Sequence, residues 1–86
     1  MAKYNFYSDP GHGWVRVRRT EVETLGIANK ITRYSYQRGL YVYLEEDCDL
    51  ATFVQAKNAR GEHVEYLPSH ANKSSKVRSY ERFSTF

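Results

Sequence analysis

The stretch YSYQRGLYVYL, residues 34–44, decides the fold because it holds two runs of strand-forming residues around one turn signal. Tyr, Val and Leu dominate these runs, and aromatic and β-branched residues are enriched in strands. Between the runs, Gln37, Arg38 and Gly39 form a three-residue loop whose glycine can take the left-handed conformation of a bulge. We therefore expect two antiparallel strands within residues 31–44.

A second hairpin is expected close to the start of the sequence. Polar and apolar side chains alternate in residues 3–7 and in residues 14–18, and a period of two is typical of a strand. The intervening residues 8–13 combine an aspartate, a proline and glycines, which is typical of a turn. Alternation predicts that the valines of the second strand face the core, whereas Arg16 and Arg18 face outward.

A short helix is expected after this hairpin, over residues 21–25. Thr20 and Glu23 have the spacing of a capping box, in which each side chain bonds a free backbone N–H of the first turn. Gly26 stands where a left-handed residue commonly ends a helix, and Ile27 can then contact Val22 as in a Schellman motif.

A longer helix is expected over residues 49–60. The acidic residues before it complement the positive end of the helix dipole, and Asp47 or Asp49 can cap it. Apolar residues then recur at helical spacing and form one face: Leu50, Phe53 and Val54. Basic residues occupy the last turns, and Gly61 is expected to end the helix.

The rest of the chain is expected to add strands. Residues 63–67 alternate as a strand that Pro68 ends, residues 69–76 are a polar loop, and residues 77–83 form a last short strand or an ordered tail. The fold class is therefore α+β: a mainly antiparallel sheet of about 4–6 strands with both helices packed on one face. Residues 1–86 form one small domain, whose C-terminal segment, residues 69–86, is basic and polar.

Length and composition exclude several classes of protein. The chain has 86 residues and a formal net charge of +3, and it contains no apolar run that approaches the roughly 18 residues of a membrane-spanning helix. Its first residues lack the apolar stretch of a secretory signal. Cys48 is the only cysteine, which excludes an internal disulfide and suits a reducing compartment. We expect a cytoplasmic protein with no membrane partner.

Clustered carboxylates are the first candidate for chemistry, because oxygen ligands can hold Mg²⁺ or Ca²⁺. The cluster comprises four residues: Glu45, Glu46, Asp47 and Asp49. An EF-hand loop spaces its acids around a central glycine, whereas these acids are nearly contiguous and no glycine follows. The pattern therefore favours the start of a helix over a metal site, with an acidic contact surface as a further alternative.

Histidine and cysteine chemistry is disfavoured in the same way. The histidines and the cysteine are spaced along the sequence in a way that matches no zinc signature; they are His12, Cys48, His63 and His70. Acidic neighbours would raise the pKa of the Cys48 thiol and oppose formation of a nucleophilic thiolate. No pair of residues has the spacing of acid–base or nucleophilic catalysis, so we expect no catalytic residue, no metal and no cofactor.

Interleaved basic and aromatic residues are the most suggestive feature. Residues 1–20 and residues 68–86 each carry four basic side chains and one acidic side chain, whereas residues 21–67 have an acidic excess. The candidate partner-binding residues are Trp14, Arg16, Arg18, Tyr34, Tyr36, Arg38, Tyr41 and Tyr43. Three interpretations stay open: a solvated strand face with cross-strand packing, a protein-binding surface, or a surface that contacts phosphates and stacks on bases.

The sequence also resembles a known family. The strings that carry the resemblance are GHGW at residues 11–14, LGI at 25–27, YSY at 34–36 and YVYLEEDCD at 41–49. They are similar to a family of short proteins encoded by bacteriophages, prophages and plasmids, and the likeness covers about residues 4–60. The family has no established activity and transfers no catalytic residue. The resemblance implies a mobile-element protein that acts in the bacterial cytoplasm, where small proteins of this origin are often inhibitors of host or defence machinery.

Two functional hypotheses follow. The first is a non-catalytic module that binds and modulates or inhibits a bacterial host protein or defence complex through tyrosine and arginine anchors. The second is a small basic nucleic-acid-binding accessory protein, whose affinity would fall steeply with salt. A homodimer is also compatible with the aromatic surplus and with an exposed sheet edge.

Overall fold

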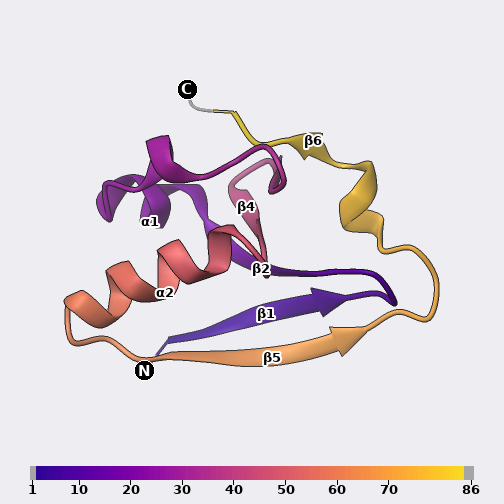
Figure 1. Cartoon of the computed structure of the whole chain (residues 1–86), viewed down its shortest axis with the longest axis horizontal. Coiled ribbons are helices and arrows are strands. Elements are labelled where there is room, and N and C mark those ends of the chain that lie inside the picture. The colour runs from indigo at the N-terminus through magenta and orange to yellow at the C-terminus, as the bar shows by residue number, and fades with distance from the viewer. Residues whose placement is uncertain (1, 85–86) are drawn as a thin grey trace.

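The chain folds into a six-stranded sheet with two helices on one side (Figure 1). The computed structural model describes residues 2–84. The elements in chain order are β1 (Ala2–Ser8), β2 (Gly13–Arg18), α1 (Arg19–Thr24), η1 (Ala28–Lys30), β3 (Tyr36–Arg38), β4 (Tyr41–Glu45), α2 (Asp49–Ala59), β5 (Val64–His70), η2 (Lys76–Ser79) and β6 (Glu81–Arg82). The predicted α+β class is confirmed. None of the helices within residues 2–84 is long and apolar enough to cross a membrane.

The sheet is mainly antiparallel, with one parallel pair at its edge. Its strand order is β5-β1-β2-β4-β3-β6, and only the β1–β5 pair is parallel in this sheet of the described chain. The prediction that Pro68 ends the last long strand is wrong, because β5 continues to His70. An edge strand tolerates proline because one side of its backbone needs no ladder hydrogen bond.

The two faces of the sheet carry different cores. The helix-covered face is aliphatic, with Val15, Val17, Val42 and Leu44 of the central strands packed against Val22 of α1 and Phe53 of α2. The opposite face is aromatic and is built on Trp14, Tyr36, Tyr43 and Val77. The predicted alternation in β2 is confirmed, since its valines lie under the helices and Arg16 and Arg18 belong to the other face.

The C-terminal segment closes the second face. β5 and β6 lie at opposite edges of the sheet, so the chain between them passes from one edge to the other (Figure 1). On the way, Val77 packs into the aromatic core and the Tyr80 ring lies 5.0 Å from the Tyr43 ring, centroid to centroid. For residues 77–83 the sequence was compatible with either a short strand or an ordered tail. The structure places the end of η2 and the short strand β6 in this segment.

The short helix ends as predicted but begins differently. The N–H of Gly26 donates to the Glu23 carbonyl and the N–H of Ile27 donates to the Val22 carbonyl, which together make the Schellman motif. Gly26 has a φ of 70°, the left-handed conformation that the motif requires. The predicted capping box is wrong: α1 begins at Arg19 directly after β2, and the residue at its N-cap makes no side-chain cap hydrogen bond.

The long helix α2 matches its predicted range closely, but its first turn is not stabilised by the predicted side-chain cap. Cys48 is the N-cap and makes no side-chain cap hydrogen bond, so neither Asp47 nor Asp49 caps α2 as we expected. Asp49 lies within the first turn and is 1% exposed. Its carboxylate accepts hydrogen bonds from the Thr32 N–H (3.1 Å), the Thr32 hydroxyl (2.8 Å) and the Ser35 hydroxyl (2.5 Å).

This link also explains why the first strand of the central hairpin is short. We expected strand structure from about residue 31, but β3 covers only Tyr36–Arg38. Residues 32–35 form a turn that wraps the Asp49 carboxylate, so they are not available for the sheet. The predicted three-residue loop of Gln37, Arg38 and Gly39 is wrong, because Gln37 and Arg38 belong to β3. The turn has two residues, Gly39 and Leu40, since Arg38 pairs with Tyr41, and Gly39 has a φ of 58°.

Candidate functional site

Most of the predicted partner-binding residues lie on the face of the sheet opposite the helices. β2 contributes Trp14, Arg16 and Arg18 to this face, and β3 and β4 contribute Tyr36, Arg38, Tyr41 and Tyr43. They share a face because antiparallel register places Arg16 opposite Tyr43 and Arg18 opposite Tyr41. Tyr34 is the exception: it lies in the turn before β3 and is 64% exposed.

Three of these residues are buried and pack rather than offer surface. Trp14 is 2% exposed, and Tyr36 and Tyr43 are each 7% exposed. The Trp14 and Tyr36 ring centroids lie 6.1 Å apart in an edge-to-face arrangement that stabilises aromatic pairs. Burial also raises the pKa of the Tyr43 hydroxyl, helped by the nearby Tyr80 hydroxyl.

The accessible layer above them consists of arginines stacked on tyrosine rings. The Arg16 guanidinium lies 4.3 Å and the Arg18 guanidinium 5.8 Å from the centroid of the Tyr41 ring. The Arg38 guanidinium lies 5.0 Å from the Tyr80 ring. We call Arg16, Arg18, Arg38 and Tyr41 the arginine face. Stacking of this kind holds a guanidinium flat on a ring and leaves its N–H edges available.

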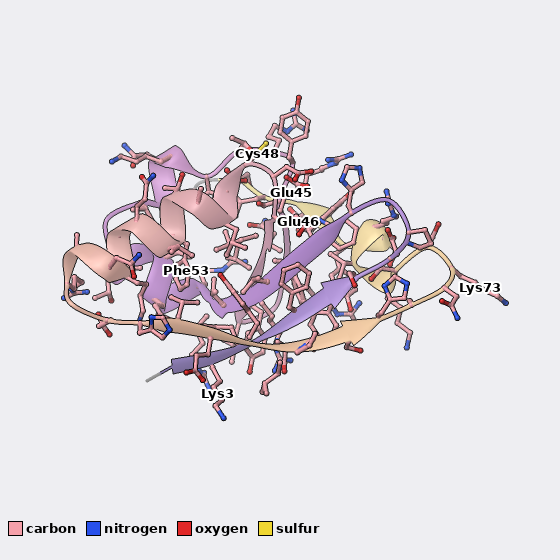
Figure 2. The ribbon with its side chains drawn as sticks, turned by 60° about the horizontal axis from the view of Figure 1, so that its bottom comes forward. Lys3, Glu45, Glu46, Cys48, Phe53 and Lys73 are labelled. Atoms are coloured by element: carbon pink, nitrogen blue, oxygen red, sulfur yellow. The ribbon has the colours of Figure 1, made fainter. Side chains whose placement is uncertain are left out.

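The charge of the arginine face is not neutralised within the described chain. No ion pair joins Arg16, Arg18 or Arg38 to a carboxylate anywhere in residues 2–84. Lys3 adds another cation, since it lines a hollow of about 450 Å³ together with Arg16, Arg18 and Tyr41. Figure 2 shows Lys3 projecting from the molecule away from α2, whereas Phe53 reaches from α2 toward the sheet. This face therefore has an unbalanced positive charge.

One carboxylate shares that hollow, and it is already engaged. Glu21 of α1 lies 2.6 Å from the Lys57 ammonium and accepts a hydrogen bond of 2.7 Å from the Tyr4 hydroxyl. Burial alone would lower the pKa of Lys57, but its hydrogen bonds to Glu21, Tyr4 and Glu62 raise that pKa overall. Glu21 therefore neutralises Lys57 rather than the arginines.

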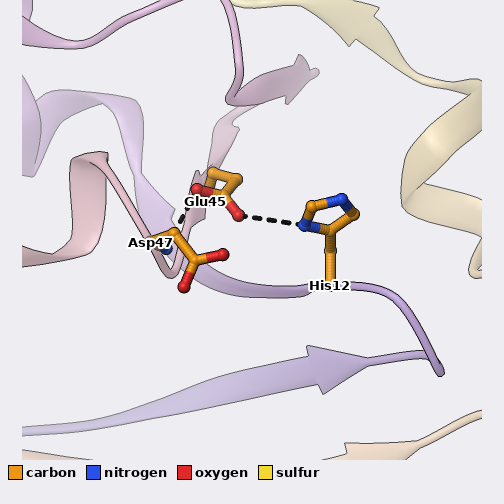
Figure 3. A group of neighbouring side chains, drawn as sticks. All are labelled: His12, Glu45 and Asp47. Atoms are coloured by element: carbon orange, nitrogen blue, oxygen red, sulfur yellow. Dashed lines mark hydrogen bonds and ion pairs between the residues drawn. The ribbon is translucent and has the colours of Figure 1, made fainter.

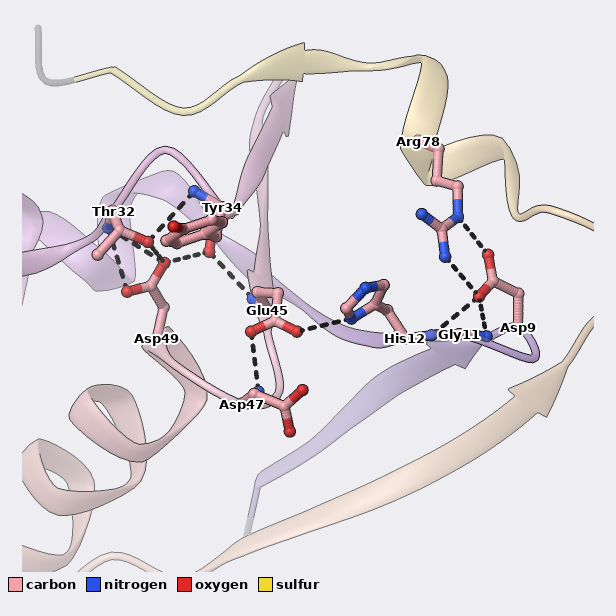
Figure 4. A network of polar contacts seen from close by, with 10 residues as sticks. Asp9, Gly11, His12, Thr32, Tyr34, Glu45, Asp47, Asp49 and Arg78 are labelled. Carbon is pink, nitrogen blue, oxygen red and sulfur yellow. Dashed lines mark hydrogen bonds and ion pairs between the residues drawn. The ribbon is translucent and has the colours of Figure 1, made fainter.

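A second polar cluster lies beyond the other end of β2, around the loop between β1 and β2 (Figure 4). The Asp9 carboxylate accepts hydrogen bonds from the N–H groups of Gly11, His12 and Ser75 and from the Arg78 side chain. The Arg78 guanidinium, 2.6 Å away, and the backbone N–H of Ser75 hold the pKa of Asp9 well below its usual range. This network fixes the loop that carries His12 and ties it to the C-terminal segment.

The acidic run contributes to this cluster more than to α2. Glu45 is the last residue of β4, and Asp47 lies in the turn that follows, so only Asp49 belongs to the helix. The Glu45 Oε2 lies 3.3 Å from the His12 Nδ1, and the other oxygen of Glu45 accepts a hydrogen bond from the Asp47 N–H (Figure 3). The contact between His12 and Glu45 could not be predicted from the sequence, because it depends on the register that places Trp14 opposite Glu45.

The remaining histidines and the cysteine do not gather into one site. The His70 Nδ1 lies 3.0 Å from the Ser8 hydroxyl, and His63 is exposed before β5. Cys48 is exposed and lines the same cavity as His12. Partial desolvation and the neighbouring carboxylates, Glu45 first among them, raise the pKa of its thiol, which disfavours the reactive thiolate.

No model of a protein family matches the chain, and neither a curated protein nor a solved structure does.

Proposed function

We propose that this protein is a non-catalytic binding module that docks its arginine face on an acidic surface of a bacterial protein or complex and thereby modulates or inhibits it. The observation that carries the proposal is the set of arginines stacked on tyrosines without a carboxylate partner. Charge of one sign that is left unbalanced on one face attracts a partner of the opposite sign. The resemblance to short mobile-element proteins supplies the bacterial context.

The arrangement of the arginines suits a protein partner energetically. Arginine, tyrosine and tryptophan are the residues most enriched among interface hot spots. A guanidinium held on a ring has lost part of its conformational freedom before binding, so less entropy is lost when it pairs with a carboxylate. Arg16 and Arg18 both lie over Tyr41, and each offers a flat fork of donors that matches an Asp or Glu side chain.

A nucleic-acid partner is less well supported, because few aromatic faces on this surface are free. Base stacking requires free aromatic faces, but Trp14 is buried and the Tyr41 ring already has the Arg16 guanidinium above it. Binding of phosphates by the same arginines therefore remains the alternative, and the experiment must distinguish it from binding of a protein.

The test is a pull-down from bacterial lysate with two matched double variants. One carries Arg18→Glu and Arg38→Glu on the arginine face, where both residues are exposed. The control carries Lys30→Glu and Arg60→Glu, also exposed and next to the helices, with the same change in net charge. Wild type and control are expected to retain the same discrete protein after nuclease treatment, and the first variant is expected to lose it.

Two outcomes would contradict the proposal. Equal recovery by both variants would mean that the arginine face is not the contact surface. Recovery that disappears after nuclease treatment and falls linearly with the logarithm of salt concentration would favour phosphate binding instead. Circular dichroism of both variants checks that each remains folded.

A further inference from the structure

We propose that His12, Glu45 and Asp47 form a binding site for a divalent transition-metal ion. One nitrogen of His12 and one carboxylate oxygen from each acid all lie within 4.8 Å of one another. They come from two different segments, the β1–β2 loop and the end of β4 with its following turn (Figure 3). Three protein ligands around one point are the donor set of an open metal site, which keeps further positions for water or a ligand.

The geometry of these residues fits metal ligation. With metal–ligand bonds of about 2.1 Å, two ligands of a tetrahedral ion stand about 3.4 Å apart. The His12 Nδ1 and the Glu45 Oε2 are 3.3 Å apart, which is close to that separation. One carboxylate oxygen of Asp47 lies within 4.8 Å of both of these atoms, and its side chain is exposed.

Glu45 is also buried, and one of its carboxylate oxygens lacks a hydrogen bond. Its side chain is only 8% exposed, and its Oε2 accepts no hydrogen bond from residues 2–84, although it lies 3.3 Å from the His12 Nδ1. A buried carboxylate oxygen without a donor is costly, and native structures rarely leave one unexplained. A cation held between this oxygen and the His12 imidazole removes that cost.

A third observation comes from the cavity beside the cluster. His12, Glu45, Asp47 and Trp14 all line a cavity of about 310 Å³. The Trp14 Nε1–H is buried and has no hydrogen-bond partner among residues 2–84. Water or an anion brought into this cavity by a bound ion would supply the acceptor that this donor lacks.

The donor set indicates the class of metal. An imidazole nitrogen favours Zn²⁺, Mn²⁺ or another transition metal over Mg²⁺ and Ca²⁺, which prefer oxygen ligands throughout. The two carboxylates balance the double charge of the ion. The Arg78 guanidinium also lines the cavity, but its charge is engaged by Asp9 at 2.6 Å.

The site is tested by equilibrium dialysis of the purified chain against Zn²⁺, with Mn²⁺ and Mg²⁺ as comparison ions. Wild type is expected to bind one Zn²⁺, and this binding should change the fluorescence of Trp14, which is the only tryptophan. His12→Ala and Asp47→Asn should each weaken Zn²⁺ binding by about tenfold or more. His63→Ala is the control, because it removes an exposed imidazole outside this cavity while leaving the three ligands intact.

The proposal is overturned if wild type binds no Zn²⁺, or if His12→Ala and Asp47→Asn bind it as wild type does. It is also overturned if binding is lost in His63→Ala instead. Because His12 and Asp47 are exposed, these variants should stay folded, and circular dichroism verifies this.

Discussion

At the scale of single residues, one buried carboxylate connects three parts of the chain. Asp9 lies in the loop after β1 and bonds the backbone of that loop, the backbone of Ser75 and the side chain of Arg78. It therefore holds the C-terminal segment against the sheet. This role of Asp9 could not be predicted from a local sequence pattern, because Ser75 and Arg78 lie 66 and 69 residues away along the chain.

Asp9 should make stability depend on acid pH. Its pKa in the folded state is below its usual value, so the stability that it contributes is fully present above the unfolded pKa of about 3.9. This contribution is lost as pH falls below that value, because the unfolded chain then binds a proton that the folded chain does not. We predict that Asp9→Asn is less stable than wild type at pH 7 and loses less stability between pH 5 and pH 3.

Urea denaturation at several pH values measures both effects. Asp47→Asn is the matched control, since it removes an exposed carboxylate for which no ion pair is found in residues 2–84. Equal slopes of stability against pH for Asp9→Asn and wild type would contradict the role assigned to Asp9.

At the scale of elements, the two helices are joined by a buried ion pair. The Lys57 side chain of α2 is 5% exposed, and the Glu21 side chain of α1 is 26% exposed. Glu62 provides Lys57 with a second, more exposed carboxylate at 3.1 Å. The cost of breaking such a pair depends on which charge is left behind, because the more buried charge is the harder to solvate.

We predict that Glu21→Gln destabilises the fold by about 1–3 kcal/mol, because it leaves the buried Lys57 ammonium with weaker partners. Lys57→Met should cost less or nothing, since it keeps an apolar stem against Phe53 and leaves a carboxylate that water can reach. The measurement is the free energy of unfolding in urea. If Lys57→Met lowers the free energy of unfolding more than Glu21→Gln does, the attraction between the two charges outweighs the cost of burying Lys57, which would contradict the prediction.

The elements also show what local sequence can and cannot predict. Both hairpins and the Schellman motif at Gly26 were predictable, because their signals lie within a few residues of each other. The extension of β5 through Pro68 was not, since it depends on β5 being an edge strand. The turn at residues 32–35 was also missed, because it is organised by Asp49 from a distant helix.

At the scale of the whole molecule, the topology separates the two candidate surfaces. The parallel β1–β5 pair and the return of the chain to β6 place the C-terminal segment across the aromatic core. The arginine face remains accessible beside it, and the metal-site residues lie at the end of the central strands. Sequence alternation predicted the arginine face, whereas the metal site needed the register between β2 and β4.

Site-specific photo-crosslinking in bacterial cells tests directly whether the arginine face binds a protein. A photoreactive residue at Leu40, which is 70% exposed in the turn between Arg38 and Tyr41, lies next to the arginine face. The same residue at exposed Lys30 samples the side of the helices. We predict a discrete protein adduct from position 40 that is insensitive to nuclease and absent from position 30. Equal adducts from both positions, nucleic-acid adducts alone, or only a second copy of this chain would contradict it.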